Sequence, residues 1–447
     1  MIILHYSLGF PPYRSGGLTK FSIDLMKQQL ISGHEVALMW PGQINFICRR
    51  LSIRRSKKDI GEGLTVDSFE IINPLPVPFD EGINRFAAFM INEDIQSYIN
   101  LLDDYRPDVI HIHTFMGLHK TFLEAAKEKG IRLVFSAHDF FPICPKVTMF
   151  RDGHICDSVE TCSVCGACNT TALSLLKIRL LQSPLYRKTK DSSLVKKLRK
   201  KHRDEYLSDA ICDAERVPIG GPEDYLALRS YYSSMLYLMD VVHYNSSVTQ
   251  RVYEKYLGNM CDCVIPVSHT DISDCRKTKN YTDNIIKIRY LGPCARIKGY
   301  YILKEALDDL WREKQNFRLD VHFEVQDKPQ YMESHARYSY NDLESILDNT
   351  DILVAPSICY ETFGFTVLEA LSFGTPVIIT DTVGAKDILV EGAGIVLKNT
   401  GSEELYEAIR DLNVEKLREM NNIIVDKQEI ITLDKVAKRI EEECYAF

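Results

Sequence analysis

The segment Glu361-Thr-Phe-Gly-Phe-Thr-Val-Leu-Glu369-Ala-Leu-Ser-Phe-Gly-Thr-Pro-Val-Ile378 places two carboxylates eight residues apart, around the point where a loop becomes a helix. The small and turn-tolerant loop lets backbone N–H groups point outward at the helix start, where the helix dipole favours an anion such as a diphosphate. An ionised glutamate instead accepts hydrogen bonds from two neighbouring hydroxyls. The pattern therefore predicts a ligand with hydroxyls at both ends and charge in the middle, as in a sugar nucleotide. The residues expected at the helix start are Thr362, Phe363, Gly364, Phe365 and Thr366.

Apolar runs that alternate with helical periodicity surround this segment and predict an α/β fold. The second half of the chain repeats the plan of the first, so we expect two doubly wound domains with mainly parallel sheets. The expected strands are 2–6, 35–40, 66–72, 108–113 and 133–137, followed by 286–291, 319–325, 352–355 and 377–380. The expected helices are 18–31, 83–102, 300–314, 366–373, 402–412 and 428–443.

The length of the chain also favours two domains, because 447 residues exceed what one hydrophobic core usually organises. The predicted boundary lies near 265–285, where Pro266 and a polar stretch interrupt the pattern. We assign residues 1–270 to the first domain, with an insert at about 142–205 that is first Cys-rich and then basic. The second domain is expected at 271–425, with a final helix in 426–447.

Five motifs, taken in order, resemble the retaining glycosyltransferases of the GT-B fold, in the large family called GT4. Glu361 to Glu369 resembles the E-x7-E signature of this family, and the other four motifs fall in 4–17, 107–113, 135–139 and 290–299. The similarity covers most of the chain apart from the insert. It implies two Rossmann-like domains that face a central cleft, with the last helix packed back on the first domain.

The resemblance also implies roles for residues on the donor side of the cleft. Glu369 is expected at the nucleotide ribose and Glu361 at hydroxyls of the donor sugar. Members of this fold stabilise the diphosphate leaving group with cationic side chains in place of a metal, and Lys298 stands in register for that role. The arginine of the family pattern is replaced by Pro293, so we expect Arg296 to swing into its place.

Two further expectations concern the first domain. Gly16 and Gly17 permit the turn and the close backbone approach that a phosphate or sugar at the start of helix 18–31 requires, although an ordinary turn has the same composition. His138 matches the active-site histidine of the family. His111 and His113 alternate with apolar residues, so we interpret both as structural histidines.

The resemblance implies a mechanism without a catalytic cofactor. Retention is expected through transfer on one face of the sugar, in which the departing phosphate oxygen takes the proton of the acceptor. The two glutamates are therefore not the acid and nucleophile of a glycoside hydrolase, since one of them is expected at the ribose.

Composition and charge exclude several other classes. The chain has 45% hydrophobic and 26% charged residues, and no run reaches the roughly 18 apolar residues of a membrane span. Residues 1–10 carry no Lys or Arg, and the thirteen cysteines do not form a secreted disulfide pattern, so we expect a cytoplasmic protein. The net charge of −8 argues against bulk nucleic-acid binding.

Five cysteines gather within 25 residues of the insert, next to His154. The Cys-x2-Cys spacing suits tetrahedral zinc and makes structural zinc the first hypothesis, with an iron–sulfur cluster and metal-free thiols as the alternatives. The candidate ligands are Cys144, Cys156, Cys162, Cys165 and Cys168.

A basic stretch follows the cysteines. Residues 177–203 contain eleven Lys or Arg against the single acid Asp191, and apolar residues are interspersed from 173 onward. The pattern is compatible with a helix on an anionic bilayer at about 173–203, or with a solvated basic helix. Membrane contact would place the protein at the inner face of the plasma membrane and make a polyprenyl-diphosphate-linked glycan a plausible acceptor.

The sequence thus predicts a retaining glycosyltransferase that moves a sugar from a nucleoside diphosphate to a glycan or lipid-linked glycan, in bacterial surface polysaccharide assembly such as capsule, exopolysaccharide or O-antigen. Two alternatives stay open. One is a sugar-nucleotide epimerase on the same fold, and the other is a non-catalytic, metal-bearing scaffold with a degenerate donor site.

Overall fold

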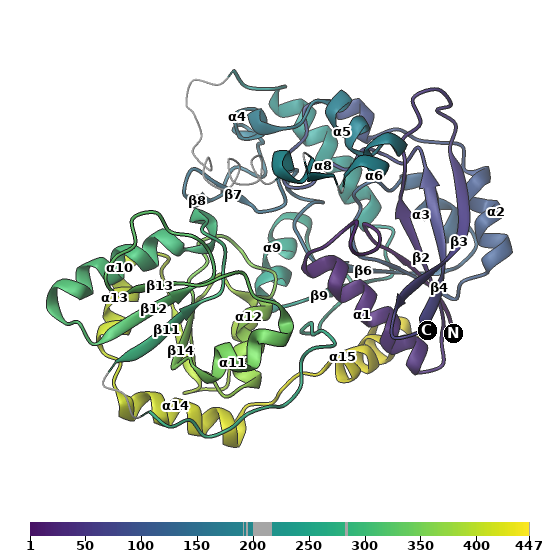
Figure 1. The fold of residues 1–447 in the computed structure, drawn as a ribbon. Coiled ribbons are helices and arrows are strands. Elements are labelled where there is room, and N and C mark those ends of the chain that lie inside the picture. Colours follow the sequence, from purple (N-terminus) through teal and green to yellow (C-terminus); the bar gives the residue numbers. More distant parts are fainter. Residues whose placement is uncertain (191, 194, 200–216, 282–284, 447) are drawn as a thin grey trace.

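The computed structural model describes residues 1–446 except 191, 194, 200–216 and 282–284. Two α/β units, each built on its own sheet, make up the described chain (Figure 1). Part of the basic stretch predicted at 173–203 lies outside the described residues. Within the described residues, no helix combines the length and the apolar character that crossing a bilayer requires.

The first sheet has eight strands in the order β10-β9-β6-β5-β1-β2-β4-β3, and all its pairings are parallel except the last. The expected parallel core strands are therefore confirmed, and each is buried on both faces. The strands are β1 (Ile2–Tyr6), β2 (Glu35–Pro41), β3 (Ser52–Gly61), β4 (Leu64–Ile72), β5 (Val109–Ile112), β6 (Arg132–Ala137), β9 (Val241–Tyr244) and β10 (Asp262–Val264).

The sequence pattern missed β3, because this strand is mostly exposed and carries charged rather than apolar residues. It pairs antiparallel with β4 at the sheet edge, where Arg54, Arg55, Lys57 and Lys58 discourage further strand pairing.

The second sheet has six parallel strands in the order β13-β12-β11-β14-β15-β16. Three of the expected strands coincide with observed ones, whereas β12 begins and ends earlier than predicted. The strands are β11 (Ile286–Tyr290), β12 (Phe317–Val321), β13 (Met332–Ser334), β14 (Ile352–Ala355), β15 (Val377–Thr380) and β16 (Gly394–Leu397). A short hairpin of β7 (Phe150–Arg151) and β8 (His154–Ile155) stands apart from both sheets.

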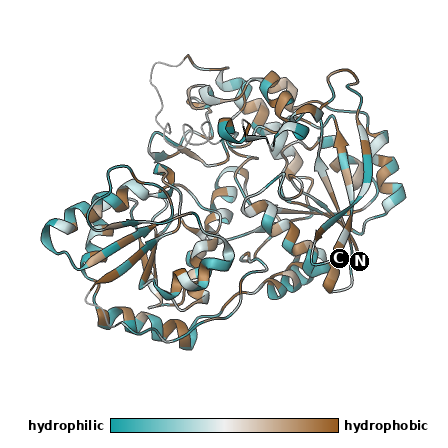
Figure 2. Ribbon diagram, viewed as in Figure 1, coloured by the Kyte–Doolittle hydropathy of each residue, from teal (hydrophilic) through white to brown (hydrophobic). Residues whose placement is uncertain are grey.

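Helices cover both sheets, and Figure 2 shows hydrophobic strands between helices with one hydrophobic and one hydrophilic side. In the first unit they are α1 (Gly17–Ile31), η1 (Phe86–Phe89), α2 (Gln96–Tyr105), α3 (Lys120–Glu128), α4 (Cys165–Cys168), η2 (Asn169–Thr171), α5 (Leu175–Leu181), α6 (Pro184–Thr189), α8 (Pro222–Leu236) and α9 (Ser247–Leu257). In the second they are η3 (Arg296–Lys298), α10 (Tyr300–Glu313), η4 (Tyr340–Asp342), α11 (Leu343–Asp348), α12 (Phe365–Ser372), η5 (Gly384–Ile388), α13 (Ser402–Arg410), α14 (Val414–Lys427), α15 (Leu433–Ile440) and η6 (Glu441–Tyr445).

The helix predicted over 83–102 is wrong in its first half. Only the short η1 and the later α2 form, because carbonyls before and at the end of η1 bind another helix. Tyr225 and Tyr232 of α8 donate their hydroxyls to the carbonyls of Ile83 and Phe89, at 3.2 and 3.1 Å, which a continuous helix would have used internally.

The end of the chain returns to the first unit. Helix α15 packs on α1 (Figure 1), and its residues Val436, Ala437 and Ile440 share a buried cluster with Phe21 and Leu25. The helix predicted over 428–443 is shorter than expected, since α15 begins only at Leu433. This return brings Tyr445, which is fully buried, into the core of the first unit.

Candidate active site

A lysine and a glutamate from separate loops of the second unit form the charged centre of the site. The Lys298 Nζ lies 2.8 Å from Glu361 Oε1, and the Ser357 hydroxyl donates to Glu361 Oε2 at 2.6 Å. Burial alone would lower the pKa of Lys298 and raise that of Glu361. The attraction between the two opposite charges has the reverse effect on both pKa values and is larger than the effect of burial. The pKa of Lys298 is therefore raised and that of Glu361 lowered, so both groups are charged at neutral pH.

Backbone geometry holds Lys298 in this position. Gly299 follows it with φ of 76°, and a β-carbon there would stand 1.8 Å from the Pro356 carbonyl oxygen. Only glycine permits this approach of η3 to the loop after β14. Ser357 was not predicted, and no spacing rule connects it with Lys298, because the two loops meet only when β11 and β14 pair.

The helix start predicted at 362–366 is α12, whose N-cap Gly364 has φ of 108° and makes no side-chain capping bond. Its first backbone N–H groups are therefore not satisfied by a cap, as an anion-binding helix start requires. Thr362, two residues before this N-cap, joins the two units. Its hydroxyl donates to the His138 carbonyl at 3.1 Å, and its own carbonyl accepts from the Ser246 hydroxyl at 2.8 Å.

The glycine loop of the first unit meets the same segment. Gly16 is the N-cap of α1 with φ of 114°, and Gly17 approaches the Phe365 ring so closely that a β-carbon would stand 3.3 Å from it. The structure thus brings together three motifs that are more than 100 residues apart: the glycine loop, the His138 turn and the start of α12.

Glu369 has a protein partner in this conformation. It is 3% exposed, and its Oε1 lies 3.2 Å from Nε2 of the fully buried His269, in the segment that connects the two units. The His269 ring contacts the rings of Phe365 and Tyr340, and the Tyr340 ring in turn lies 4.6 Å from Lys20 Nζ of α1. Sequence reasoning missed His269 and Tyr340, since neither falls in a motif.

In this structure Arg296 does not lie beside Lys298 and Glu361, where it was expected to replace the arginine missing at Pro293. Its side chain is exposed and lies beside the turn of the β7–β8 hairpin, where a β-carbon on Gly153 would stand 3.1 Å from Nη2. Pro293 instead belongs to a tight turn whose carbonyl accepts from the Tyr290 hydroxyl at 2.9 Å. In this structure Lys298 is therefore the cation that contacts Glu361, and Arg296 contacts the insert.

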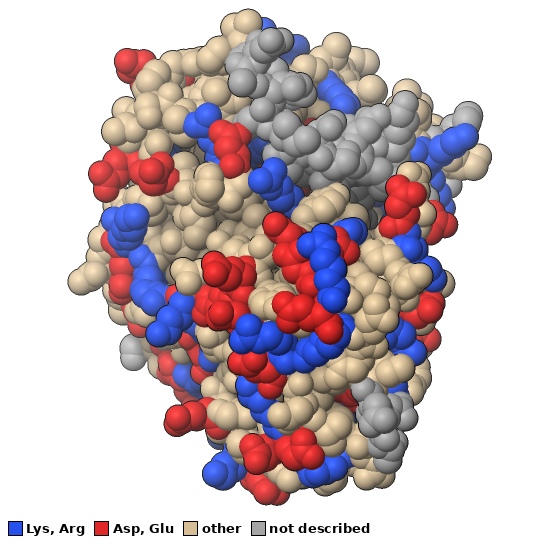
Figure 3. Space-filling model, turned by 90° about the vertical axis from the view of Figure 1, so that its left-hand side faces the viewer, with Lys and Arg blue, Asp and Glu red and all other residues tan. Residues whose placement is uncertain are grey.

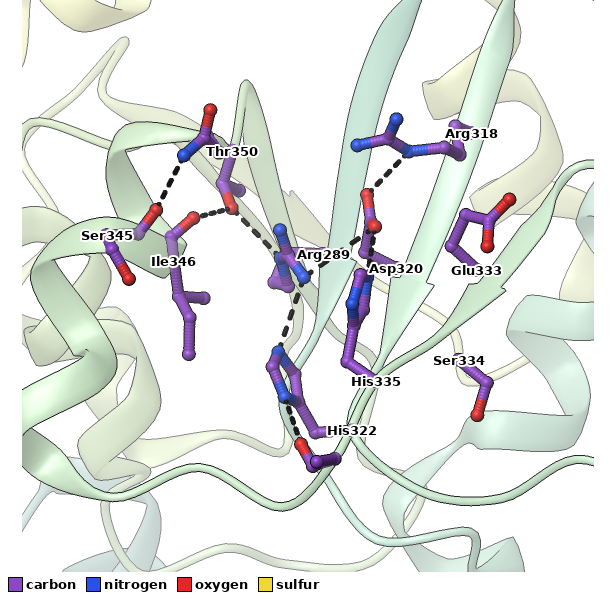
Figure 4. Close-up of polar contacts among 12 residues, drawn as sticks. Arg289, Arg318, Asp320, His322, Glu333, Ser334, His335, Ser345, Ile346 and Thr350 are labelled. Carbon is purple, nitrogen blue, oxygen red and sulfur yellow. Dashed lines mark hydrogen bonds and ion pairs between the residues drawn. The ribbon is translucent and has the colours of Figure 1, made fainter.

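Polar residues also connect β11, β12, the segment after β13 and the end of α11 (Figure 4). The buried Asp320 of β12 accepts from Arg318 Nε at 3.0 Å and contacts His335 Nε2 at 2.6 Å, while Arg289 Nη1 lies 3.8 Å away. Arg289 also donates to Thr350 at 3.1 Å. These contacts hold the segment after β13 against β12, at the carboxyl end of the sheet where ligands of open α/β folds bind.

His138 belongs to a buried hydrogen-bonded chain that contains five histidines. The other four are His5, His111, His113 and His243, each fully buried or nearly so. Nine consecutive hydrogen bonds, of 2.6 to 3.2 Å, join them through Gln29, Tyr445 and Ser136, from Asn245 at one end to the Ile265 carbonyl at the other. The prediction that His111 and His113 are structural agrees with this geometry.

One end of the chain fixes the proton positions of all its members. A carbonyl only accepts, so His243 must donate its Nε2–H to Ile265, and a neutral ring then accepts at Nδ1. The same requirement passes from partner to partner, so every histidine donates from Nε2 and accepts at Nδ1. The last ring, His138, must accept from the amide nitrogen of Asn245, which leaves the buried Asn245 Oδ1 without a partner among the described residues.

Two consequences follow for the site. Both ring nitrogens of His138 bind protein groups, so this side chain supports the turn that carries the Thr362 contact. His5, His111 and His113 are close enough together to suggest a metal site, but all six of their ring nitrogens are already hydrogen-bonded. Burial lowers the pKa of His5 and His243 to about 4 and of His138 to about 3, which keeps these rings neutral.

The cysteines of the insert do not form the predicted metal site. In the described part of the chain, the only group of three or more ligand atoms within 4.8 Å of one another is the histidine trio, so no three of the five sulfurs converge. Cys162 Sγ instead accepts from Arg229 Nη2 at 2.9 Å, and hydrogen bonds from Cys165 and Arg229 lower its pKa to about 7. The structural zinc hypothesis is therefore not supported, and the thiol alternative fits better.

We expect protein purified without oxygen to contain far less than one zinc or iron per chain and to lose no stability in a chelator, because no cysteine set is arranged as a tetrahedral site. Elemental analysis and thermal melts with and without EDTA measure both. One tightly held zinc per chain, with a fall in melting temperature on chelation, would contradict this expectation.

Comparison with known proteins adds two family matches. The family described as Glycosyltransferase Family 4 matches residues 15–156, and the family described as Glycosyl transferases group 1 matches residues 331–427. Together they cover just over half of the chain, and they include the glycine loop, His138 and both glutamates. An uncharacterized glycosyltransferase from Methanocaldococcus jannaschii is 25% identical over 210 residues, which are 40% of this chain and 58% of that protein.

Solved structures of low sequence identity share the fold over nearly the whole chain. Sucrose-phosphate synthase from Thermosynechococcus elongatus has a TM-score of 0.56 at 12% identity and covers 98% of this chain and 97% of its own. Anabaena HepE in complex with UDP and glucose has a TM-score of 0.55 at 14% identity and covers all of both chains. Starch synthase IV from Arabidopsis thaliana, bound to ADP and acarbose, has a TM-score of 0.55 at 14% identity, covering 99% of this chain and 98% of its own.

Proposed function

Because the chain belongs to the GT4 type of glycosyltransferase with the GT-B fold, we propose that it transfers a sugar, with retention, from a nucleoside diphosphate to a hydroxyl of a glycan or lipid-linked glycan acceptor. The observation that carries the proposal is the charged Lys298–Glu361 pair beside the uncapped start of α12. It combines a cation, free backbone N–H groups and a hydroxyl acceptor, the three features that a sugar nucleotide requires.

The donor would lie with its diphosphate at the start of α12 and near Lys298. Fixed positive groups there stabilise the charge that develops as the bond between the anomeric carbon and the phosphate oxygen breaks. The acceptor oxygen forms the new bond to the anomeric carbon, and its proton passes to the departing phosphate oxygen. Glu361 would orient the sugar hydroxyls. Glu369 would exchange its contact with His269 for hydrogen bonds from the ribose hydroxyls. The bound UDP and ADP of HepE and starch synthase IV support a nucleoside diphosphate as the leaving group.

Residues of both units surround the space in which the glycan part of the acceptor would lie. An open cleft lies next to Tyr360 and Thr382, between α9 and the ends of β15 and β16, with Arg251, Lys255 and Lys398 in its lining. The opposite charges on the face shown in Figure 3 are interspersed, so no field of a single sign covers it. We also propose that the product is a surface polysaccharide and that the acceptor is anchored in a membrane.

A panel of UDP-, GDP-, ADP- and dTDP-sugars tests the proposal. We expect one nucleotide class to raise the melting temperature, since a ligand that binds only the native state stabilises it, and to be hydrolysed slowly without acceptor. NMR of the transfer product would establish the anomeric configuration of the new glycosidic bond. If no nucleotide sugar binds at millimolar concentration, the alternative of a non-catalytic scaffold is favoured.

A further inference from the structure

Two arginines from separate elements of the first unit converge on one aromatic ring. The guanidinium of Arg14, in the glycine loop, lies 4.6 Å from the ring centroids of Tyr13 and Phe79. That of Arg187, in α6, lies 5.2 Å from the Tyr13 ring and 5.1 Å from the Trp40 ring. Lys190 Nζ approaches the same Tyr13 ring at 4.9 Å. Three cations thus gather around Tyr13.

The negative charge near the two arginines is less than their positive charge. Arg187 Nη1 donates to Glu70 at 2.8 Å, whereas Arg14 has no carboxylate within ion-pair distance among the described residues. Arg14 Nε and Arg187 Nη2 are both buried and have no hydrogen-bond partner in that part of the structure. Buried donors without acceptors are costly, and two guanidinium groups over the same ring place two positive charges in one region, so the site favours an anion with several oxygens.

The location of the cluster connects it with the reaction. Arg14 precedes by three residues the glycine that touches Phe365 at the start of α12. On the other side, α5 and α6 expose large apolar side chains, with Leu176 at 70%, Leu180 at 49% and Leu185 at 65% exposure. Cationic groups next to exposed leucines, two of them (Leu185 and Arg187) in the same helix α6, complement an amphiphile.

We propose that Arg14 and Arg187 bind the phosphate or diphosphate of a lipid-linked acceptor, whose apolar chain lies on the exposed leucines of α5 and α6. The proposal rests on the proposed transferase function and specifies the acceptor side of that site. The donor diphosphate belongs to the start of α12 in the second unit, whereas Arg14 and Arg187 belong to the first unit, so the two anions would have different ligands.

Tryptophan fluorescence gives a local readout, because Trp40 lies in this cluster and the only other tryptophan, Trp311, packs in the second unit. In a Trp311→Phe background, farnesyl diphosphate serves as the probe and is compared with farnesol and inorganic pyrophosphate. We expect saturable quenching by farnesyl diphosphate, with much weaker binding of the other two. Arg14→Gln should weaken binding at least tenfold, and the matched control Arg54→Gln, an exposed arginine on the other side of Glu70, should not.

Two further arms separate this proposal from the donor site and from plain membrane adsorption. Lys298→Met should keep farnesyl diphosphate binding, and Arg14→Gln should keep the thermal shift by the nucleotide sugar. Equal affinity for farnesyl diphosphate in Arg14→Gln, or its loss in Lys298→Met, would overturn the proposal. Binding to vesicles of phosphatidylglycerol without binding of farnesyl diphosphate would overturn it as well, in favour of a membrane-surface role for the basic residues.

Discussion

Replacement of Glu361 by glutamine lowers kcat for nucleotide-sugar turnover by about a hundredfold to a thousandfold, the effect typical of removing one preorganised electrostatic contact. Glutamine is close to glutamate in size and keeps one oxygen for the Ser357 hydroxyl. It removes the charge that holds Lys298 in place and raises its pKa. The sugar also loses an acceptor that can bind two hydroxyls at once.

The measurement is steady-state and single-turnover kinetics with the nucleotide sugar identified by the panel, together with the Kd for the free nucleotide. We expect a large change in kcat and a small change in nucleotide affinity, because Glu361 is placed at the sugar and not at the base. Glu391→Gln, at an exposed glutamate of the same unit, provides the matched control. Activity near that of the control would remove Glu361 from the catalytic machinery and weaken the proposed function.

Mild acid should unfold the protein over a narrow pH range. In the folded state burial lowers the pKa of His5 and His243 to about 4 and of His138 to about 3, and it lowers those of His111 and His113 well below the ordinary value. The unfolded chain binds these protons near pH 6.5. The stability that the neutral histidines contribute is therefore complete above about pH 6.5 and is lost as pH falls towards 4.

The magnitude is large because five groups act together. Near pH 5.5 the unfolded state would bind about 4.5 more protons than the folded state, so the free energy of unfolding falls by about 6 kcal/mol per pH unit. Over one to two pH units, this loss equals the whole free energy of unfolding of a typical domain. Neighbouring charges do little to raise the lowered pKa values of these five histidines. The groups that interact with them are mainly the other histidines of the hydrogen-bonded chain, and Arg439 and Glu443 interact with His243.

Urea denaturation between pH 8 and 5 measures this dependence, and long-range proton–nitrogen NMR correlation at pH 7 tests the Nε2–H tautomers directly. The variant His154→Gln, at an exposed histidine of the insert, should leave the pH dependence unchanged. A free energy of unfolding that stays constant down to pH 5 would contradict the all-neutral hydrogen-bonded chain. Resonances of these five histidines that titrate near pH 6.5 in the folded state would contradict it as well.

Much of the fold and part of the site could be predicted from the sequence, because the relevant signals are local. The period of apolar residues predicted nine strands that the structure contains, and the spacing of Glu361 and Glu369 predicted a loop and a helix start that coincide with α12. The same rules failed at β3, whose edge position replaces apolar residues with charges, and at 83–95, whose carbonyls bind tyrosines of α8.

The contacts between distant side chains depend on how the segments pack. Strand order brings Lys298 to Glu361 and Ser357, the returning C-terminal segment supplies Tyr445 to the histidine chain, and α6 places Arg187 beside Arg14. The insert likewise positions its cysteines too far apart for the metal that their spacing suggested. Most of the strands and helices could be inferred from neighbours along the chain, because the apolar period and the turn residues are local signals. Which charged and polar side chains meet depends on the packing of segments up to hundreds of residues apart, and no periodicity carries that information.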